Sequence, residues 1–402
     1  MISIEEAQRS ILECITPLET EKVSVFQGLN RVTPEAHVAP WDIPAADNSA
    51  MDGFAFSHAA LDGNRLKVTG FLPAGEVCRA PVPAGEAIRI MTGAPVPDGC
   101  DTVVPIEDVA EEGEWIRLTS TIRAGSHVRE RGEDIRHGNT VIPAGSLLRP
   151  QEIGMLSAMG TTSLAVYRKA RVAILSTGDE LLEPGSTPLP GKIINSNSYS
   201  LAAQVLDAGG DPVLLGIARD NLDATCEKIR AGLNADFLVI TGGVSVGDRD
   251  FVKVAIEKLG GRITFWKVDM KPGKPLAFAM LQGKPIFALP GNPVAAMVSF
   301  ELFVRPSLLK AMGHWRIFRP KVRAVLQEQV TNTGTRPHLI RGIVSAHDDR
   351  YRVSTTGNQS SGRLSSLIQG NGLIRLAPDT SYARGDEVEV LLLDRGFELG
   401  EA

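Results

Sequence analysis

One stretch of the chain, residues 236–250, limits the possible folds more than any other. An apolar run over 237–240 stops at two glycines, Gly242 and Gly243, and apolar residues then recur at helical spacing over 251–259. The pattern predicts a strand, a glycine turn and a helix. A turn of this kind presents successive backbone N–H groups at a helix N-terminus, an arrangement that favours binding of an anion.

Two carboxylates, Asp248 and Asp250, lie in the same turn. Carboxylates repel an anion unless a cation lies between them, so the combination indicates a metal ion that bridges protein and phosphate. The structural alternative is a tight strand-to-helix turn capped by Asp248. The stretch alone does not separate the two interpretations.

A basic segment follows downstream. Residues 265–275 place Lys267, Lys271 and Lys274 on a strand and the turn after it. Lysines usually lie on a solvated face, but three of them near a Pro-Gly turn and an anion-binding loop form a local basic patch.

A second turn of interest, Pro-Gly-Asn-Pro at 290–293, ends the apolar run 285–289. Asn292 is predicted to be the N-cap of a helix that has Pro293 at its first position. The turn therefore supplies a second helix N-terminus with free N–H donors, whether or not it binds a ligand.

The size and charge of the chain limit its functional class. A length of 402 residues predicts roughly two to four domains. The formal charge of −5 argues against generic nucleic-acid binding, so anionic substrates must be attracted by local patches.

The four cysteines form neither a Cys-x-x-Cys motif nor a Cys/His pair at zinc spacing, which fits a reducing compartment. With no signal peptide and no apolar run of about 18 residues, we expect a soluble, cytoplasmic protein without a membrane partner.

The N-terminal half combines a helix with a β-rich module. Ser3 and Glu6 form a capping box at the start of an amphipathic helix. The loop 40–56 is rich in Asp, Asn and Ser, which turn chemistry alone can explain. From 65 to 141, short strand-like runs alternate with Pro-Ala-Gly turns and predict an all-β module.

From residue 168 onward, short strands alternate with helices and predict a doubly wound, mostly parallel α/β sheet. Ligands of such sheets bind beyond the carboxyl ends of the strands. The predicted strand ends bring together acidic, basic and glycine residues from five segments: Ser176, Thr177, Gly178, Asp179 and Glu180; Asp220; 242–250; 271–274; and 290–293. After residue 313 the pattern changes again, and 320–393 predicts a small β-barrel or sandwich.

Seven short motifs occur in order along nearly the whole chain. They lie at 47–53 (Asp-Asn-Ser-Ala-Met-Asp-Gly), 90–94 (Ile-Met-Thr-Gly-Ala), 131–134 (Arg-Gly-Glu-Asp), 176–180 (Ser-Thr-Gly-Asp-Glu), 242–247 (Gly-Gly-Val-Ser-Val-Gly), 271–275 (Lys-Pro-Gly-Lys-Pro) and 289–293 (Leu-Pro-Gly-Asn-Pro). The ordered set resembles the molybdopterin molybdenumtransferase (MoeA) family, which is related to the E domain of gephyrin and to plant molybdenum-insertase proteins.

The resemblance implies a multidomain protein of α/β plus β class. Its parts are an N-terminal helical linker domain (1–45 and 140–167), an inserted β-rich domain (46–139), a MoaB/Mog-like α/β domain that binds molybdopterin (168–313) and a C-terminal β-barrel (318–398). It also implies an elongated homodimer whose cleft combines the α/β domain of one subunit with N-terminal segments of the other.

The activity implied by the resemblance belongs to molybdenum-cofactor biosynthesis. The enzyme takes adenylylated molybdopterin and molybdate, inserts the metal at the dithiolene and releases AMP with help from Mg²⁺. The upstream molybdopterin adenylyltransferase is the implied partner that supplies the substrate.

The implied site residues fall into overlapping groups. Catalytic roles fall on Asp52, Thr92, Glu180, Asp220, Asp250, Lys267 and Lys271. Binding of substrate and oxyanion falls on Arg129, Asp134, Ser176, Thr177, Gly178, Gly242, Gly243, Ser245, Gly247, Lys274, Pro290, Gly291, Asn292 and Pro293. The Mg²⁺ ligands are expected among Glu180, Asp220, Asp248 and Asp250, because carboxylate oxygens suit that ion.

Two other functions fit parts of the pattern. An adenylyltransferase would share the α/β module but would leave 1–167 and the C-terminal β-domain unexplained. A gephyrin-like scaffold would need a linker or an extra domain for which the sequence gives no sign.

The sequence also departs from the family at Asp269, which stands between the lysines, and at Phe54, where the family usually has Tyr.

Overall fold

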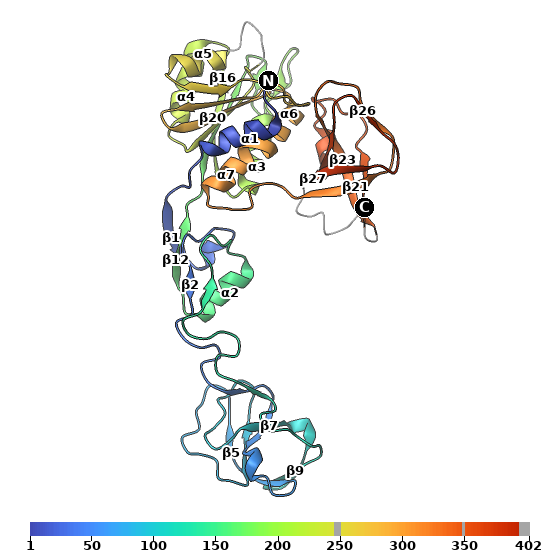
Figure 1. Cartoon of the computed structure of the whole chain (residues 1–402). Helices are drawn as coiled ribbons and strands as arrows, with labels where there is room; N and C mark the ends of the chain where they lie inside the picture. Colours follow the sequence, from blue (N-terminus) through green and yellow to red (C-terminus); the bar gives the residue numbers. More distant parts are fainter. Residues whose placement is uncertain (245–250, 348–349, 394–402) are drawn as a thin grey trace. The chain divides into compact units, whose positions relative to one another are not determined.

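The computed structural model describes residues 1–244, 251–347 and 350–393. The chain divides into two compact units (Figure 1). The first unit comprises Met1–Pro34, Gly145–Arg149 and Leu164–Ala402, and the second comprises Glu35–Ala144 and Pro150–Ser163.

A six-stranded sheet forms the centre of the first unit. Its order is β16 (Asp211–Ala218), β13 (Arg171–Thr177), β17 (Phe237–Thr241), β20 (Lys284–Leu289), β19 (Ala277–Leu281) and β18 (Arg262–Phe265). The first four strands run parallel, and β19 and β18 each pair antiparallel with their neighbours. The predicted mostly parallel sheet is confirmed.

Helices cover both faces of this sheet (Figure 1). They are α1 (Ile4–Glu13), α3 (Asn197–Asp207), α6 (Pro293–Ser299) and α7 (Arg305–Ala311) on one face, and α4 (Leu222–Gly232) and α5 (Phe251–Lys258) on the other. Side chains of β13 alternate between the two cores, because Val172 and Ile174 face the first group and Ala173 and Leu175 face the second. The sheet is thus doubly wound, as predicted.

The predicted capping box at the start of α1 is confirmed. Ser3 Oγ accepts a hydrogen bond from Glu6 N–H at 3.1 Å, and Glu6 Oε2 accepts one from Ser3 N–H at 2.8 Å. These bonds satisfy donors that a helix start leaves open. The helix buries Ile4 and Ile11 against the first core.

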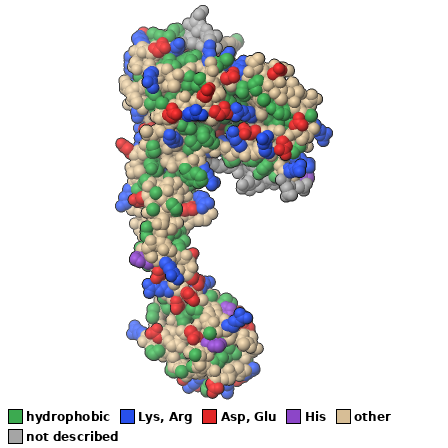
Figure 2. Space-filling model, in the orientation of Figure 1, with side chains coloured by type: hydrophobic (Ala, Val, Ile, Leu, Met, Phe, Trp, Pro, Cys, Tyr) green, Lys and Arg blue, Asp and Glu red, His purple; other side chains and the backbone are tan. Residues whose placement is uncertain are grey.

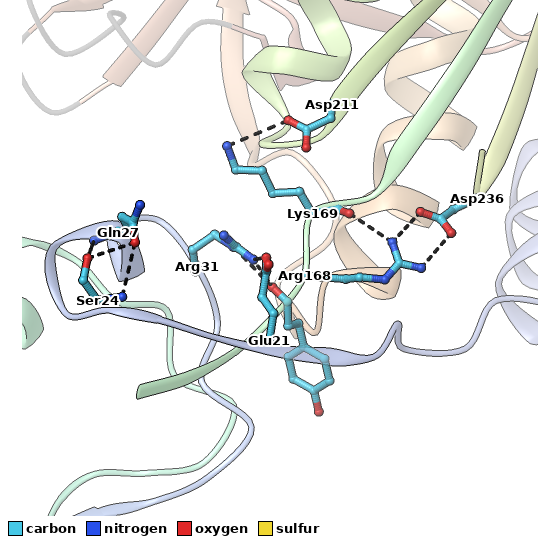
Figure 3. A network of polar contacts seen from close by, with 9 residues as sticks. Glu21, Ser24, Gln27, Arg31, Arg168, Lys169, Asp211 and Asp236 are labelled. Atoms are coloured by element: carbon cyan, nitrogen blue, oxygen red, sulfur yellow. Dashed lines mark hydrogen bonds and ion pairs between the residues drawn. The ribbon is translucent and has the colours of Figure 1, made fainter. Parts of the chain in front are cut away.

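Ionic contacts attach the strand pair β1 (Thr20–Ser24) and β12 (Ser163–Tyr167) to the α/β sheet (Figure 3). Arg168 donates to both carboxylate oxygens of Asp236, at 2.6 and 2.8 Å. Arg31 donates to the Tyr167 carbonyl at 2.7 Å and pairs with Glu21. The bidentate geometry at Asp236 fixes the chain just where β13 begins.

The C-terminal part of the first unit is a closed barrel, which confirms the predicted β-barrel. Its strands are β21 (Lys321–Leu326), β24 (Arg350–Thr355), β23 (His338–His347), β25 (Gly372–Leu376) and β27 (Glu387–Leu392). Alternate residues of β23, such as Ile340 and Val344, fill the barrel interior. Leu339, the residue before Ile340, faces the other way and joins the core of the α/β sheet, so the barrel and the sheet share packing.

A buried ion pair stabilises this contact. Glu301 lies in a π-helical turn (Phe300–Val304) between α6 and α7, and its Oε2 accepts from Arg319 Nε at 2.9 Å. Arg319 also donates to Asp207 at 3.0 Å. The Glu301 and Arg319 side chains are 8% and 7% exposed.

Glu301→Ala is therefore expected to lower the free energy of unfolding by about 3–5 kcal/mol, because it leaves Arg319 buried without its main partner. Urea denaturation would measure the change. The matched control is Glu389→Ala, which breaks the exposed Lys321–Glu389 pair and should cost less than about 1 kcal/mol. Equal losses in the two variants would contradict the assigned role of the buried pair.

The second unit contains another six-stranded sheet, in the order β7-β4-β6-β5-β9-β8. The strands are β7 (Thr102–Pro105), β4 (Gly53–Phe56), β6 (Glu86–Ile90), β5 (Arg65–Leu72), β9 (Trp115–Leu118) and β8 (Val109–Glu112). Phe54, where the family usually has Tyr, is 2% exposed and packs in one core with Phe56, while Ala55 faces the other. Position 54 therefore belongs to the hydrophobic core of this chain, and its side chain lacks the hydroxyl that a Tyr would carry.

The second unit also contains the helix α2 (Pro150–Ala158). It has two short strand pairs, β2 (His37–Val38) with β11 (Thr140–Ile142) and β3 (Asn48–Ser49) with β10 (Val128–Arg129). On the face seen in Figure 2, acidic and basic side chains are interspersed within each unit. The described part of the chain contains no helix with the length and hydropathy of a transmembrane span.

Candidate active site

A cavity of about 480 Å³ opens at the carboxyl ends of β13, β17 and β20, where the sequence predicted a ligand site. Its size lies within the range of small-molecule sites. Eleven of the predicted residues line its wall: Ser176, Thr177, Gly178, Glu180, Asp220, Gly242, Gly243, Pro290, Gly291, Asn292 and Pro293. Ser245, Gly247, Asp248 and Asp250 lie outside the described residues.

The glycine turn after β17 lies directly over Thr177. Gly242 and Gly243 have φ of +89° and +63°. A Cβ at Gly242 would lie 2.6 Å from the Thr177 carbonyl oxygen, and one at Gly243 would lie 2.8 Å from Thr177 Oγ1. Both the backbone conformation and the close approach therefore require glycine. Without side chains, the turn leaves its backbone open to the cavity.

Two carboxylates from neighbouring strand ends line the same cavity. Asp179 N–H donates to Asp220 Oδ2 at 3.2 Å, and Asp220 N–H donates to Asp179 Oδ1 at 3.3 Å, so the two loops hold each other. Glu180 folds back over Gly178, where an added Cβ would lie 2.6 Å from Glu180 Oε1. Glu180 and Asp220 both face the cavity. Among the described residues, no group of three or more Asp, Glu, His or Cys side chains is placed to hold a metal ion. Asp248 and Asp250 lie outside the described residues and are not covered by this statement.

Two asparagines in the cavity wall were missed by the sequence analysis. Asn197 Nδ2 donates to Thr241 Oγ1 at 2.9 Å and to the Gly291 carbonyl at 2.8 Å, which joins the two turns after β17 and β20. Asn195 Oδ1 accepts from Ser176 Oγ at 3.0 Å. The available signal was the run Asn-Ser-Asn-Ser before a helix, which also reads as ordinary capping.

Two buried polar atoms at this wall have no hydrogen-bond partner within the described residues. They are Thr177 Oγ1 and Asn197 Oδ1. Because an unsatisfied buried polar group costs about 1–3 kcal/mol, such atoms are rare in folded proteins. Their position beside the glycine turn is consistent with polar contacts to a bound ligand.

The turn after β20 differs in one respect from the prediction. Asn292 occupies the N-cap position of α6 and Pro293 follows at the helix start, but the Asn292 side chain makes no capping bond. Asn292 Nδ2 instead donates to Ser361 Oγ at 3.0 Å, in the loop before α8 (Ser365–Gln369). The predicted N-cap position of Asn292 is therefore confirmed, while its side chain binds a partner that is distant in sequence.

The basic segment leaves the sheet at the same edge as the cavity. β18 ends at Phe265, so Lys267 lies after the strand rather than on it, as do Lys271 and Lys274. Lys271 N–H donates to the Pro337 carbonyl at 2.9 Å, and the Lys271 carbonyl accepts from Leu339 N–H at 2.7 Å. These bonds attach the lysine segment to the start of β23 in the barrel.

Arg341 is a further candidate site residue that the sequence did not single out. Its side chain is fully buried, and within the described residues no carboxylate pairs with it. Nε donates to Ser366 Oγ at 2.9 Å and Nη2 to the Ser360 carbonyl at 3.0 Å, while Nη1 has no partner there. Burial lowers the pKa of Arg341. A buried cation without a counterion is a natural binding group for an anion.

His338 lies beside these cations. Burial, with Lys271 and Arg341 nearby, lowers its pKa from 6.5 to about 4. Between these pH values the unfolded chain binds a proton that the folded protein does not, so the free energy of unfolding falls as pH decreases from 6.5 toward 4. We expect a loss of about 2–3 kcal/mol from this residue between about pH 7 and about pH 4.5.

Urea denaturation at about pH 7 and about pH 4.5 tests this expectation. In His338→Gln the difference between the two pH values should be smaller than in the wild type, because Gln does not titrate. An unchanged difference would show that His338 does not carry the effect.

In the second unit the structure pairs two of the predicted residues. Thr92 donates to Asp52 Oδ1 from its backbone N–H and from Oγ1, both at 2.7 Å. The backbone and the hydroxyl hydrogen bond lower the pKa of Asp52. Arg129 lies on β10 opposite Asn48, and Asp134 N–H donates to the Ile43 carbonyl at 3.2 Å. The Asp52, Arg129 and Asp134 side chains are exposed.

Three family models match the chain in order. The model described as "MoeA N-terminal region (domain I and II)" matches residues 2–160, "Probable molybdopterin binding domain" matches 173–310, and "MoeA C-terminal region (domain IV)" matches 323–393. The matches outside 173–310 disfavour the adenylyltransferase alternative, which would explain the α/β module alone.

Curated relatives are similar over nearly the whole chain. A molybdopterin molybdenumtransferase of Nostoc sp. is 36% identical over 98% of this chain and 94% of its own length. Molybdopterin molybdenumtransferase 2 of Mycobacterium tuberculosis is 35% identical, covering 97% of this chain and 99% of the relative. Among solved structures, a molybdopterin biosynthesis MoeA protein of Pyrococcus horikoshii has a TM-score of 0.82 at 30% identity and covers 98% of this chain and 100% of that one.

Proposed function

The chain belongs to the MoeA family, and on that basis we propose that it acts as a molybdopterin molybdenumtransferase in molybdenum-cofactor biosynthesis. In the proposed reaction it binds adenylylated molybdopterin and molybdate, transfers molybdenum to the dithiolene and releases AMP. One observation supports this most strongly: the glycine turn after β17, Glu180 and Asp220 line one cavity together with unpartnered polar atoms.

The cavity suits a phosphate-bearing ligand. The side-chain-free turn at Gly242 and Gly243 leaves backbone groups open beside Thr177. Thr177 Oγ1 can donate a hydrogen bond and has no acceptor in the described protein. We assign phosphate binding to this turn and to Thr177, with Asn197 holding the turns after β17 and β20 at fixed spacing.

Glu180 and Asp220 are suitable ligands for Mg²⁺. Both carboxylates line the cavity from adjacent strand ends, and oxygen atoms are the ligands that this ion prefers. Bound Mg²⁺ would neutralise phosphate charge during cleavage of the phosphoanhydride. Asp248 and Asp250 stay proposed ligands from the sequence, since they lie outside the described residues.

The oxyanion requires a separate group of cations. Molybdate is a dianion, and we assign it to Lys271 and Lys274, with Lys267 nearby in the chain and the buried charge of Arg341 adding electrostatic attraction. Ser360 and Ser361 connect Arg341 to Asn292 at the cavity wall. The oxyanion would therefore lie on the barrel side of the phosphate-binding turn.

The remaining assignments come from the family. We propose a homodimer in which Asp52, Thr92, Arg129 and Asp134 contact the substrate bound to the partner. The upstream adenylyltransferase would supply that substrate, and the cytoplasm would be the site of the reaction. The hydrogen bonds from Thr92 keep Asp52 ionised, as a charged contact requires.

The test is AMP release from adenylylated molybdopterin by the purified full-length protein with Mg²⁺. We expect release that depends on molybdate and that stops when Mg²⁺ is chelated. Tight substrate binding without AMP release, with and without molybdate, would contradict the proposal and favour a carrier or scaffold.

A further inference from the structure

One side of the active-site cavity is apolar and open to solvent. It consists of Leu181, Ile193 and Ile194, which we call the apolar rim. Ile193 is 58% exposed and Ile194 is 36% exposed, although isoleucine is among the residues most often buried. The same cavity is also lined by the glycine turn and the phosphate-binding groups.

The apolar rim has a fixed position relative to the polar groups. β14 (Leu181–Leu182) and β15 (Ile193–Ile194) pair in parallel, with Leu181 opposite Ile193 and Leu182 opposite Ile194. Ile193 N–H donates to the Glu180 carbonyl at 2.9 Å, and Asn195 N–H donates to the Leu182 carbonyl at 2.8 Å. The strand pair thus connects Glu180 at one end with Asn195 at the other.

We propose that the apolar rim binds a flat heteroaromatic ring of the substrate, and that it thereby separates ring recognition from phosphate recognition in this cavity. The inference rests on the proposed function, because a pterin nucleotide is the ligand that combines such rings with phosphate. A ring placed on the rim removes exposed apolar surface from water, while its phosphate reaches the glycine turn across the cavity.

Both the pterin and the adenine of the substrate are flat heteroaromatic rings. Their shared chemistry fits the rim, since aliphatic side chains pack against either ring face. Binding measurements with separate ligands distinguish them. The probes are AMP, a pterin monophosphate and inorganic pyrophosphate, each titrated calorimetrically into the full-length protein with Mg²⁺.

The test variant is Ile193→Ser/Ile194→Ser, with Ile194→Ala as a milder second variant that keeps the strand pair apolar. The double substitution should weaken binding of at least one ring ligand about tenfold or more, because it removes most of the apolar contact area. Pyrophosphate affinity should change less than about twofold. Loss of AMP binding alone would assign adenine to the rim, and loss of pterin binding alone would assign the pterin. Ile194→Ala should show a smaller loss for the same ligand.

Leu206→Ser is the matched control, because Leu206 on α3 is 61% exposed and does not line the cavity. It should leave all three affinities unchanged. If the folded Ile variants bind both ring ligands as tightly as the wild-type protein does, the inference is overturned. The proposed function still stands in that case if the wild-type protein releases AMP. Failure of the wild type to bind any of the three ligands would overturn both.

Discussion

Glu180→Gln is expected to reduce molybdate-dependent AMP release about 100- to 1,000-fold, the usual cost of removing one electrostatic group from a reacting centre. Glu180 lines the cavity with Asp220, and its backbone carbonyl holds the apolar rim through Ile193. Glutamine keeps the size of the side chain but removes the charge that a Mg²⁺ ligand supplies. The rate should not be recovered at saturating substrate, because the substitution affects the chemical step.

The measurement is a steady-state assay of AMP release at increasing Mg²⁺. A rightward shift of the Mg²⁺ dependence in Glu180→Gln would support its role as a ligand. Glu183→Gln is the control, since Glu183 is exposed nearby and lies outside the cavity wall. A wild-type rate in Glu180→Gln would contradict the Mg²⁺ assignment, as would an equal loss in the control.

Arg341→Met is expected to raise the molybdate concentration needed for half-maximal AMP release about 10-fold, because it removes a buried positive charge whose attraction for the dianion is worth about 1–2 kcal/mol. Its effect on folding should be small, within about 1 kcal/mol, although the side chain is fully buried. Burying an arginine without a carboxylate partner is costly, and relief of that cost offsets the hydrogen bonds lost at Ser360 and Ser366.

The two readouts are a molybdate titration and urea denaturation of the same preparation. Arg352→Met provides the control, because Arg352 lies exposed on β24 of the same barrel. An unchanged molybdate dependence in Arg341→Met would exclude Arg341 from the oxyanion site. A loss of several kcal/mol of stability with unchanged activity would make its role purely structural.

Local patterns in the sequence were sufficient for the elements that bring the site together. The apolar run ending at Gly242 and Gly243 predicted a strand and a turn, and the turn lies at the cavity as expected. The alternation of strands and helices predicted the doubly wound sheet, because each buried strand and each amphipathic helix has its own period. The rule that ligands bind beyond the carboxyl ends of parallel strands then located Glu180 and Asp220 at one edge.

Contacts between distant segments escaped the same reasoning. Arg341 lies in the fully buried first half of β23, and its importance depends on packing between the barrel and the loop at Ser360 and Ser366. Asn197 read as a helix-start residue, whereas its amide joins β17 to the turn after β20. Asn292 is the N-cap of α6 as predicted, but its side-chain amide donates to Ser361. For the two asparagines, a short polar side chain satisfies local capping rules equally well, so only the folded chain reveals its partner.

The most direct test compares two products of one reaction. Purified full-length protein is supplied with adenylylated molybdopterin, molybdate and Mg²⁺, and molybdenum bound to the pterin is counted against AMP released. We predict about one molybdenum atom per AMP, with neither product formed in the absence of molybdate. AMP release without molybdenum in the pterin would contradict insertion and reduce the activity to hydrolysis of the nucleotide.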